Sequence, residues 1–312
     1  MGYGTAQVAV ETIDGKPDSI TVNGMPVGAT VQQLADPEML LAATNKSGID
    51  RRVISPPPFT YRYWDDPRAT LELHRLLNDA TASLVEAFPD RLVGLATVPL
   101  QDNDLAIGEL RRARRELGLS GLSLGTNVAG GNIADEIRRP LLAAAAESDT
   151  PILVHPDFVP NPRWDTHYLI NLIGMPVDTA IAMANLAFSG RFAEFPGLRF
   201  CFVHGGGAAP YLFGRLDRGW KVRSETKTHI DRPPTMHLNA VFCDSLTHSP
   251  EALAYLVDVM GADRVVIGTD SPFDVEDSDP LASLAAAPRL SDEDRTTVRT
   301  ISPLAWLYGR VS

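Results

Sequence analysis

Hydrophobic and polar residues follow two alternating patterns along most of this chain. Short runs of consecutive apolar residues recur, which is typical of parallel strands covered on both faces. The segments between them carry apolar residues at helical spacing, most clearly at 104–118, 134–148 and 249–261. This alternation predicts a parallel sheet, most simply a (β/α)8 barrel. The expected strands are residues 52–55, 92–100, 122–124, 151–155, 198–204, 238–244 and 263–270.

The N-terminal end of the chain departs from this pattern. Residues 5–24 alternate between polar and apolar, as expected of an antiparallel hairpin turning at Asp14–Gly15, and a helix is expected from about Asp36. The recognisable barrel strands are then one fewer than a closed barrel needs. The predicted fold is α/β, a (β/α)8 TIM-barrel-like single domain that is distorted or incomplete at its first strand. Residues 1–35 form the hairpin insertion and residues 36–312 the barrel.

Composition and charge narrow the class of partner. The chain of 312 residues is 44% hydrophobic and 21% charged, which is ordinary for a globular protein with a large core. Its net charge of −11 would repel phosphates, so we expect no nucleic-acid partner. The first residues lack the pattern of a signal peptide, and no apolar run approaches the roughly 20 residues that span a bilayer. We therefore expect a cytoplasmic protein with no membrane partner, and reduced, buried thiols at Cys201 and Cys243.

Three of the expected strands end in a residue suited to metal or proton chemistry. His155, His204 and Asp270 each follow an apolar run, and reactive groups in barrels lie at the carboxyl ends of strands. Imidazole and carboxylate are ligands that suit zinc and similar divalent ions. Taken singly, each histidine is more typical of a structural hydrogen bond, and the aspartate is as typical of a helix cap as of a ligand. Together they predict one site, with the three side chains within about 10 Å of each other.

The stretch His204-Gly205-Gly206-Gly207 requires close approach of the backbone at a strand end. It is not a phosphate loop, because the glycines are contiguous and no lysine follows them. We expect the glycines to let the chain turn sharply beside a bound substrate.

Several segments resemble a known family. The stretches ILVHPDF, FAEFPGLRFCFVHGGGAAPYLFGRLDRGW and DRVVIGTDSPF are similar to the amidohydrolase superfamily, in particular to its amino-carboxymuconate-semialdehyde decarboxylase-like branch. The resemblance covers about residues 2–308 and implies a metal-dependent barrel, most often with zinc or manganese. That branch contains decarboxylases as well as hydrolases and hydratases.

The resemblance also implies roles for the three strand-end residues. His155 matches a metal ligand, and Asp270 matches a ligand that also transfers protons. His204 matches the catalytic histidine beside the metal.

Further residues are implied to bind the substrate. Arg215 matches an arginine that reaches the substrate carboxylate of a neighbouring subunit, which implies a homodimer, and an internal salt bridge is its alternative role. Phe273 and Trp64 are expected to line the pocket.

The sequence departs from the family pattern in two places. The family's first strand carries a His-x-His pair of metal ligands, and this chain has none; its first histidine, His74, is expected at a helix surface. Either the true start lies upstream, which the other well-kept motifs favour, or this homologue has lost its metal or binds it weakly. The arginine that the muconate-semialdehyde decarboxylases carry after Asp-Pro-Glu is also missing, since Met39 follows. A differently anchored substrate is therefore expected.

Three functions remain in competition. The first is a metal-dependent, non-oxidative decarboxylase of an unsaturated or aromatic carboxylic acid, a small-molecule substrate. The second is a hydrolase or hydratase using the same metal. The resemblance implies zinc as this metal, with manganese as the alternative. The third is a metal-free barrel acting as a binding or regulatory subunit.

Overall fold

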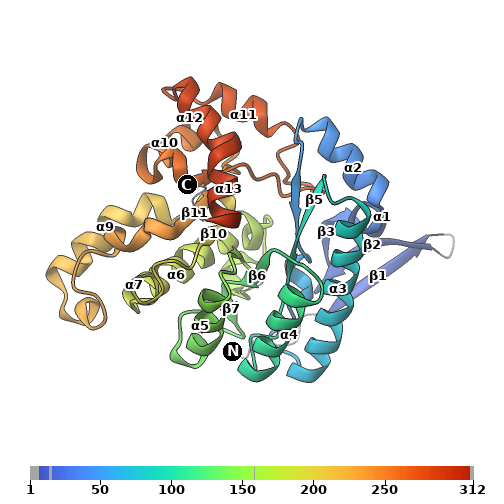
Figure 1. Ribbon diagram of the computed structural model, residues 1–312, viewed down its shortest axis with the longest axis horizontal. Helices are drawn as coiled ribbons and strands as arrows, with labels where there is room; N and C mark the ends of the chain where they lie inside the picture. Colours follow the sequence, from blue (N-terminus) through green and yellow to red (C-terminus); the bar gives the residue numbers. More distant parts are fainter. Residues whose placement is uncertain (1–6, 14–15, 158, 310–312) are drawn as a thin grey trace.

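A parallel sheet forms the centre of the protein, which is described here by a computed structural model covering residues 7–13, 16–157 and 159–309. The sheet has seven strands in the order β12-β11-β10-β9-β6-β5-β4, and every neighbouring pair is parallel. It curls into a partial barrel with helices packed around it (Figure 1). Its strands are β4 (Arg52–Ile54), β5 (Leu92–Ala96), β6 (Gly121–Gly125), β9 (Ile152–His155), β10 (Phe200–Phe202), β11 (Val241–Asp244) and β12 (Val265–Val266). Within the described ranges β4 and β12 end the sheet without pairing, so the prediction of an incomplete TIM-barrel-like fold is confirmed.

Helices connect successive strands, as the periodicity predicts. Ser249 caps α10 through a hydrogen bond that its side chain accepts from the backbone of Ala252. The longer helices are α3 (Pro67–Ala87), α4 (Asn103–Arg115), α5 (Arg139–Glu147), α6 (Met175–Phe188), α9 (Ala209–Val222) and α10 (Pro250–Met260). The shorter ones include α7 (Arg191–Glu194), α11 (Pro280–Ala286), α12 (Asp292–Thr296) and α13 (Ser302–Tyr308).

The N-terminal residues form a separate antiparallel sheet of β1 (Val8–Ile13), β2 (Lys16–Val22) and β3 (Met25–Thr30). The predicted pairing of β1 with β2 is confirmed, and its turn at Asp14–Gly15 lies outside the described residues. The third strand was not predicted. It follows a two-residue turn at Asn23–Gly24, where both residues have positive φ, the conformation that tight hairpins require. Two short helices, α1 (Val31–Ala35) and α2 (Pro37–Lys46), then lead into the barrel.

Side chains on the two faces of the sheet build two hydrophobic clusters. The larger one packs the sheet against the surrounding helices, with Phe200 and Phe202 fully buried in it. The smaller one lies on the opposite face and includes Cys201, Phe242 and Trp306 of α13. Cys201 and Cys243 are free and buried, which confirms the expectation for the thiols.

His74 corrects one expectation. It lies in α3 and is fully buried, not at the surface, because its Nε2–H donates to the carbonyl oxygens of Thr60 and Tyr61 at 3.2 and 3.1 Å. The loop before α3 folds back over this helix and covers it, which the helical pattern of residues 67–87 does not reveal.

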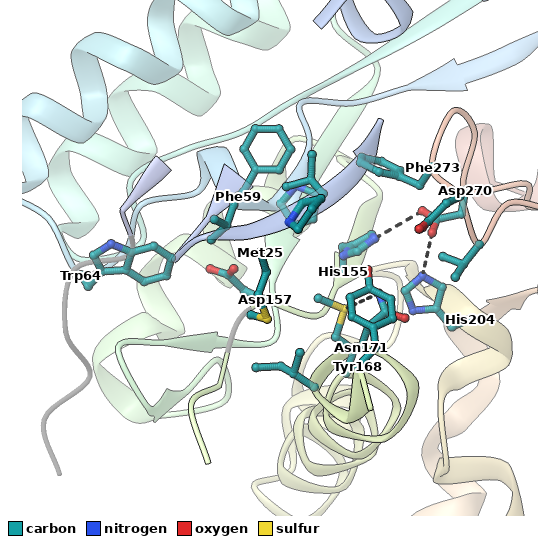
Figure 2. A pocket seen from close by; sticks show the side chains of 18 residues that line it. Met25, Phe59, Trp64, His155, Asp157, Tyr168, Asn171, His204, Asp270 and Phe273 are labelled. Atoms are coloured by element: carbon teal, nitrogen blue, oxygen red, sulfur yellow. Dashed lines mark hydrogen bonds and ion pairs between the residues drawn. The ribbon is translucent and has the colours of Figure 1, made fainter. Parts of the chain in front are cut away.

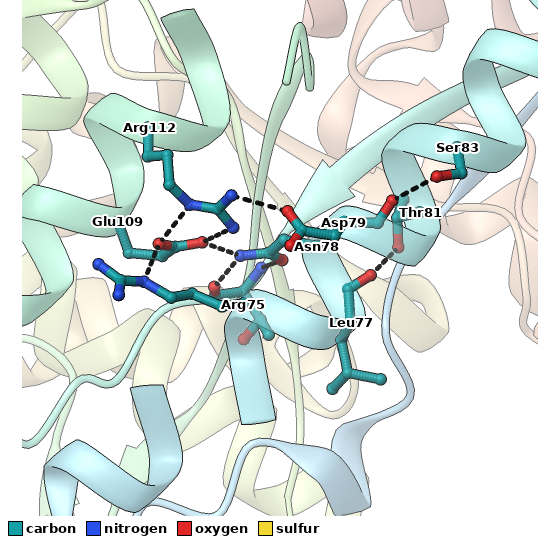
Figure 3. A network of polar contacts seen from close by, with 9 residues as sticks. Arg75, Leu77, Asn78, Asp79, Thr81, Ser83, Glu109 and Arg112 are labelled. Carbon is teal, nitrogen blue, oxygen red and sulfur yellow. Dashed lines mark hydrogen bonds and ion pairs between the residues drawn. The ribbon is translucent and has the colours of Figure 1, made fainter. Parts of the chain in front are cut away.

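A buried polar network joins α3 to α4 (Figure 3). Glu109 of α4 is almost fully buried and accepts hydrogen bonds from Asn78 at 2.8 Å and from Arg112 at 2.9 Å, with Arg75 at 3.3 Å. Asn78 also bonds the backbone of Thr97 just beyond β5. Since each member is paired, this network fixes the two helices against the sheet.

A short π-helical segment, η4 (Ile170–Gly174), runs directly into α6. Together they make one helix, Ile170–Phe188, which is long and apolar enough to cross a membrane by length and composition alone, although Asn171, Asp178 and Asn185 interrupt its apolar residues. Half of its apolar window is buried inside the protein, as in a core helix. The cytoplasmic location stays a prediction.

Candidate active site

The three strand-end residues meet at one mouth of the barrel (Figure 2). Nε2 of His155 lies 3.7 Å from Oδ1 of Asp270, and Nε2 of His204 lies 3.7 Å from Oδ2 of the same carboxylate. The two imidazole rings stand edge to face with their centroids 4.9 Å apart. This proximity agrees with the expectation drawn from the strand ends.

His204 reaches the site through an unusual backbone conformation. β10 ends at Phe202, earlier than predicted, and the chain leaves it through an irregular turn, α8 (Val203–Gly206). His204 itself has φ 57° and ψ 47°, the left-handed region that non-glycine residues rarely adopt. Asp270 also has a positive φ of 53°. Two of the three site residues therefore hold strained conformations, which is common at functional sites.

The three glycines after His204 approach other parts of the chain, and none of them lines the pocket. A Cβ on Gly206 would lie 2.7 Å from Sγ of Cys243, and one on Gly207 would lie 2.3 Å from the carbonyl oxygen of Pro176. All three have positive φ. The expected sharp turn is present, but the glycines pack it into the barrel wall and do not face the pocket.

Asp244 supports this turn and was missed from the sequence. It ends β11, is buried, and its Oδ1 accepts hydrogen bonds from the backbone N–H of Gly205 at 2.8 Å and of Leu246 at 3.1 Å. Its place at the end of an expected strand was the available signal, as for His155.

Hydrogen bonding and charge set the protonation of the site. Nδ1–H of His155 donates to the carbonyl oxygen of Pro156 at 2.8 Å, which leaves Nε2 as the acceptor that faces Asp270. Burial works to raise the pKa of Asp270, but the side chains of His155 and His204, whose Nε2 atoms lie 3.7 Å from its oxygens, outweigh burial and hold that pKa well below its usual range. Burial also works to lower the pKa of His204, while Asp270 and Asp244 overcome it and raise that pKa.

The donor set fits a divalent ion. One ring nitrogen of each histidine and a carboxylate oxygen of Asp270 lie within 4.8 Å of one another. Ligands bound at about 2.1 Å to a tetrahedral ion are about 3.4 Å apart, close to the separations found here. Among the described residues this is the one group of histidine, cysteine and acidic side chains arranged in this way. An ion held by only some of these side chains keeps positions for a substrate or water, as in catalytic sites.

An apolar pocket opens from the three residues. Trp64 and Phe273 line it, in agreement with the sequence expectation. Val22 and Met25 of the N-terminal sheet also line it, which the sequence did not indicate. Arg215 does not line it: this residue lies exposed on α9, outside the pocket of its own chain.

A partial parallel barrel with two histidines and an aspartate gathered beyond the carboxyl ends of its strands is the architecture of metal-dependent α/β-barrel enzymes. Residues 26–299 match the amidohydrolase family, and the chain belongs to it. The resemblance noted in the sequence is therefore confirmed.

Relatives with assigned activities place the chain within that family. It is 35% identical over 240 residues to a 2-amino-3-carboxymuconate-6-semialdehyde decarboxylase of Dictyostelium discoideum, covering 76% of this chain and 67% of the relative. It is 30% identical to a 2-keto-4-carboxy-3-hexenedioate hydratase of Sphingobium, covering 65% and 59%.

A solved structure extends the comparison. The 5-carboxyvanillate decarboxylase of Novosphingobium aromaticivorans, solved with manganese and a nitrobenzoic acid, superposes with a TM-score of 0.79 at 26% identity, over 89% of this chain and 82% of that one. A divalent metal as the family's cofactor is supported by that neighbour.

Proposed function

We propose that this protein is a metal-dependent, non-oxidative decarboxylase of an aromatic or unsaturated carboxylic acid. The observation that carries the proposal is the convergence of His155, His204 and Asp270 within 4.8 Å at the mouth of an apolar pocket. The decarboxylases among the relatives and neighbours support the same reaction class.

Metal binding and proton transfer are assigned to different residues of this chain. His155 and Asp270 would hold the ion, which when bound supplies a Lewis acid that anchors the substrate through its carboxylate or an adjacent oxygen. Asp270 also holds His204 by charge, and the raised pKa of His204 keeps a proton on its imidazole closer to neutral pH. His204 donates this proton to the carbon that loses carbon dioxide: the C–C bond breaks, its electron pair stays on that carbon, and a C–H bond forms. Solvent then returns a proton to His204.

The apolar wall keeps this proton transfer specific. Phe273 and Met25 line the pocket beside the three site residues (Figure 2). Such a wall excludes water, so that the developing carbanion takes its proton from His204.

We propose zinc or manganese as the metal. The imidazole of His155 and the carboxylate of Asp270 are ligand types that suit zinc, and the structural neighbour holds manganese. Dialysis against a chelator should abolish turnover, and reloading with each ion separately, followed by metal analysis, identifies the ion that restores it. Turnover by the metal-stripped protein would contradict the assignment.

We further propose a homodimer in which Arg215 reaches the partner's substrate. Arg215 is exposed and has no hydrogen bond or ion pair with another described residue, so an internal salt bridge does not explain it. Tyr211, one turn earlier on α9, is 82% exposed. Mixing the inactive variants Arg215→Ala and His204→Ala should restore part of the activity. In a mixed dimer, one of the two sites would combine the intact His204 of one chain with the intact Arg215 of the other. No recovery in a protein shown to be dimeric by light scattering would contradict it.

The decisive test is release of carbon dioxide. Carboxyl-labelled hydroxybenzoates incubated with the metal-loaded protein should release labelled carbon dioxide, and the His204→Gln variant should release at least about 100-fold less. Hydration of an unsaturated acid without loss of label would favour the second function, which the hydratase relative makes a specific alternative. A protein that catalyses neither reaction and holds no metal, but still binds the ligand, would favour the third function, a metal-free binding or regulatory subunit.

A further inference from the structure

One wall of the pocket is formed by a segment whose orientation opposes its hydrophobic pattern. In η4 the polar Asn171 lines the pocket, whereas its apolar neighbours Leu172 and Ile173 are 53% and 48% exposed. The hydrophobic effect alone would favour the opposite arrangement, with the apolar side chains inside and the amide in water. Contact with a partner chain would account for the two exposed apolar side chains, but not for a carboxamide at a largely apolar pocket. Such conflicts between local pattern and fold are expected at functional positions.

The backbone of this segment fixes that orientation. His167 and Tyr168, just before η4, both have φ 57°, in the left-handed region that non-glycine residues rarely adopt. η4 itself is π-helical, and short π-helical turns inside α-helices occur frequently at functional sites. Gly174 at the end of η4 lies against the ring of Trp164, where a Cβ would meet Cε3 at 2.8 Å. Asn171 is therefore held by packed structure on both sides of it.

The side chain of Asn171 keeps an acceptor for a ligand. Its Nδ2–H donates to Sδ of Met175 at 3.6 Å, a weak bond to sulfur, and its Oδ1 accepts no hydrogen bond within the described ranges. Among the described lining residues it is the one carboxamide, and it carries no charge (Figure 2). An amide oxygen at an apolar wall gains most from a hydrogen-bond donor on the bound ligand.

A ring hydroxyl or amino group is the substituent that would satisfy this oxygen. A methyl group has nearly the size of a hydroxyl but cannot donate a hydrogen bond, and the apolar wall by itself favours the methyl group. A preference for hydroxyl over methyl at the same ring position therefore reports a polar partner in the pocket.

We propose that Asn171 determines specificity by accepting, through Oδ1, a hydrogen bond from a hydroxyl or amino substituent of the substrate. The inference rests on the proposed decarboxylase function only for the anchoring of the substrate carboxylate at the end of the pocket that holds His155 and Asp270. Asn171 is not assigned any part in the bond-breaking step.

The test measures binding, separately from turnover. The manganese-loaded protein is titrated by calorimetry with 2-, 3- and 4-hydroxybenzoate and with the matched 2-, 3- and 4-methylbenzoates. At one ring position or more, the hydroxyl compound should bind more tightly than the methyl compound. Asn171→Leu, which keeps the volume and removes the amide, should reduce that preference by about fivefold. Comparison with the wild type cancels any preference that the metal itself has for a hydroxyl group.

A second variant tests the acceptor role itself. Asn171→Asp keeps an oxygen acceptor at the same place, and its charge weakens the binding of both members of each pair alike. It should therefore retain most of the hydroxyl preference that Asn171→Leu loses.

Asn185→Leu is the matched control. It makes the same change in α6 at a residue outside the pocket, whose amide donates to the carbonyl oxygen of Ile181 at 2.9 Å. It should leave every hydroxyl-to-methyl ratio within about twofold of the wild type.

Three results would overturn the proposal. They are unchanged ratios in Asn171→Leu at all ring positions, an equal change in Asn185→Leu, and a loss in Asn171→Asp as large as that in Asn171→Leu. If Asn171→Leu does not fold, the wild type and Asn171→Asp decide. Methylbenzoates that bind the wild type at least as tightly as the hydroxybenzoates at every position, or no binding of any of these compounds, then also overturn it.

Parallel carbon dioxide assays keep the two proposals apart. A ratio that shifts with Asn171→Leu in a protein that releases no carbon dioxide would leave the role of Asn171 standing and the decarboxylation wrong. Carbon dioxide release with an unchanged ratio would leave decarboxylation standing and the role of Asn171 wrong.

Discussion

The backbone N–H of Gly205 donates a hydrogen bond of 2.8 Å to Oδ1 of Asp244, and this bond holds the left-handed turn from which His204 faces Asp270. The bond crosses between the ends of two adjacent strands, β10 and β11. Asp244 thus acts on the proposed chemistry through His204, whose position it holds and whose pKa its charge helps to raise.

The first prediction follows from this bond. Asp244→Ala should lower kcat by about tenfold or more, because the turn loses its acceptor and a buried N–H is left unpaired. Asp244→Asn keeps an oxygen acceptor and should recover most of that loss. Steady-state kinetics, with metal analysis of each variant, checks this. If Asp244→Ala has the same kcat as the wild type, Asp244 has no positioning role. If Asp244→Ala and Asp244→Asn lose the same activity, the negative charge of Asp244 is needed.

The second prediction separates metal binding from proton transfer. His204→Gln should lower kcat by roughly 10² while most of the metal is retained, whereas His155→Ala should lower the metal content itself. The exposed His248 provides the control, since His248→Gln should change neither quantity. Atomic absorption on the dialysed proteins and a turnover assay measure the two effects. Loss of metal in His204→Gln would reassign His204 as a primary ligand.

The third prediction concerns Gly206. Gly206→Ala should destabilise the fold by about 1–3 kcal/mol, because the residue has φ +74° and the new Cβ would meet Sγ of Cys243 at 2.7 Å. The double variant Gly206→Ala/Cys243→Ala should recover part of this loss. Gly214→Ala on α9 is the control, since its Cβ would enter open space and should be neutral or stabilising. Denaturant unfolding measures all of these, and a Gly206→Ala protein as stable as the wild type would argue against close packing at the turn.

The fourth prediction is a pH dependence that originates from His74. Burial lowers the pKa of His74 to about 4, whereas an unfolded histidine titrates near 6.5. The unfolded chain therefore binds a proton that the folded chain does not, and stability falls as the pH drops from about 6.5 to about 4, by roughly 3 kcal/mol in all. His74→Gln can still donate a hydrogen bond to Thr60 or Tyr61 and should reduce this slope. Unfolding free energies measured between pH 7 and 4 check it, and identical slopes in variant and wild type would contradict it.

The sequence predicted the features that depend on local pattern. Apolar runs such as 151–155 marked the barrel strands, and the strand-end positions of His155, His204 and Asp270 predicted that they would meet. It did not reveal contacts made by distant segments. The burial of His74 under its own preceding loop and the packing of Gly206 against Cys243 depend on which elements become neighbours in three dimensions.

The sequence also did not predict which residues form the wall of the pocket. Val22 and Met25 belong to a sheet whose pattern reads as a half-exposed hairpin, and only the fold brings that sheet over the barrel mouth. Asp157 is buried and lines the pocket, and the sequence does not predict this because no spacing distinguishes it from a loop residue.

The parallel register of the sheet limits how the length of this chain can change in evolution. Val154 lies level with Phe202, and Phe202 with Cys243, so His155 and Val203 leave their strands at the same height. One residue inserted into or deleted from β9 or β10 would turn every later side chain of that strand to the opposite face. Single substitutions leave this register unchanged. Changes of length, in contrast, are tolerated only in the connections between strands.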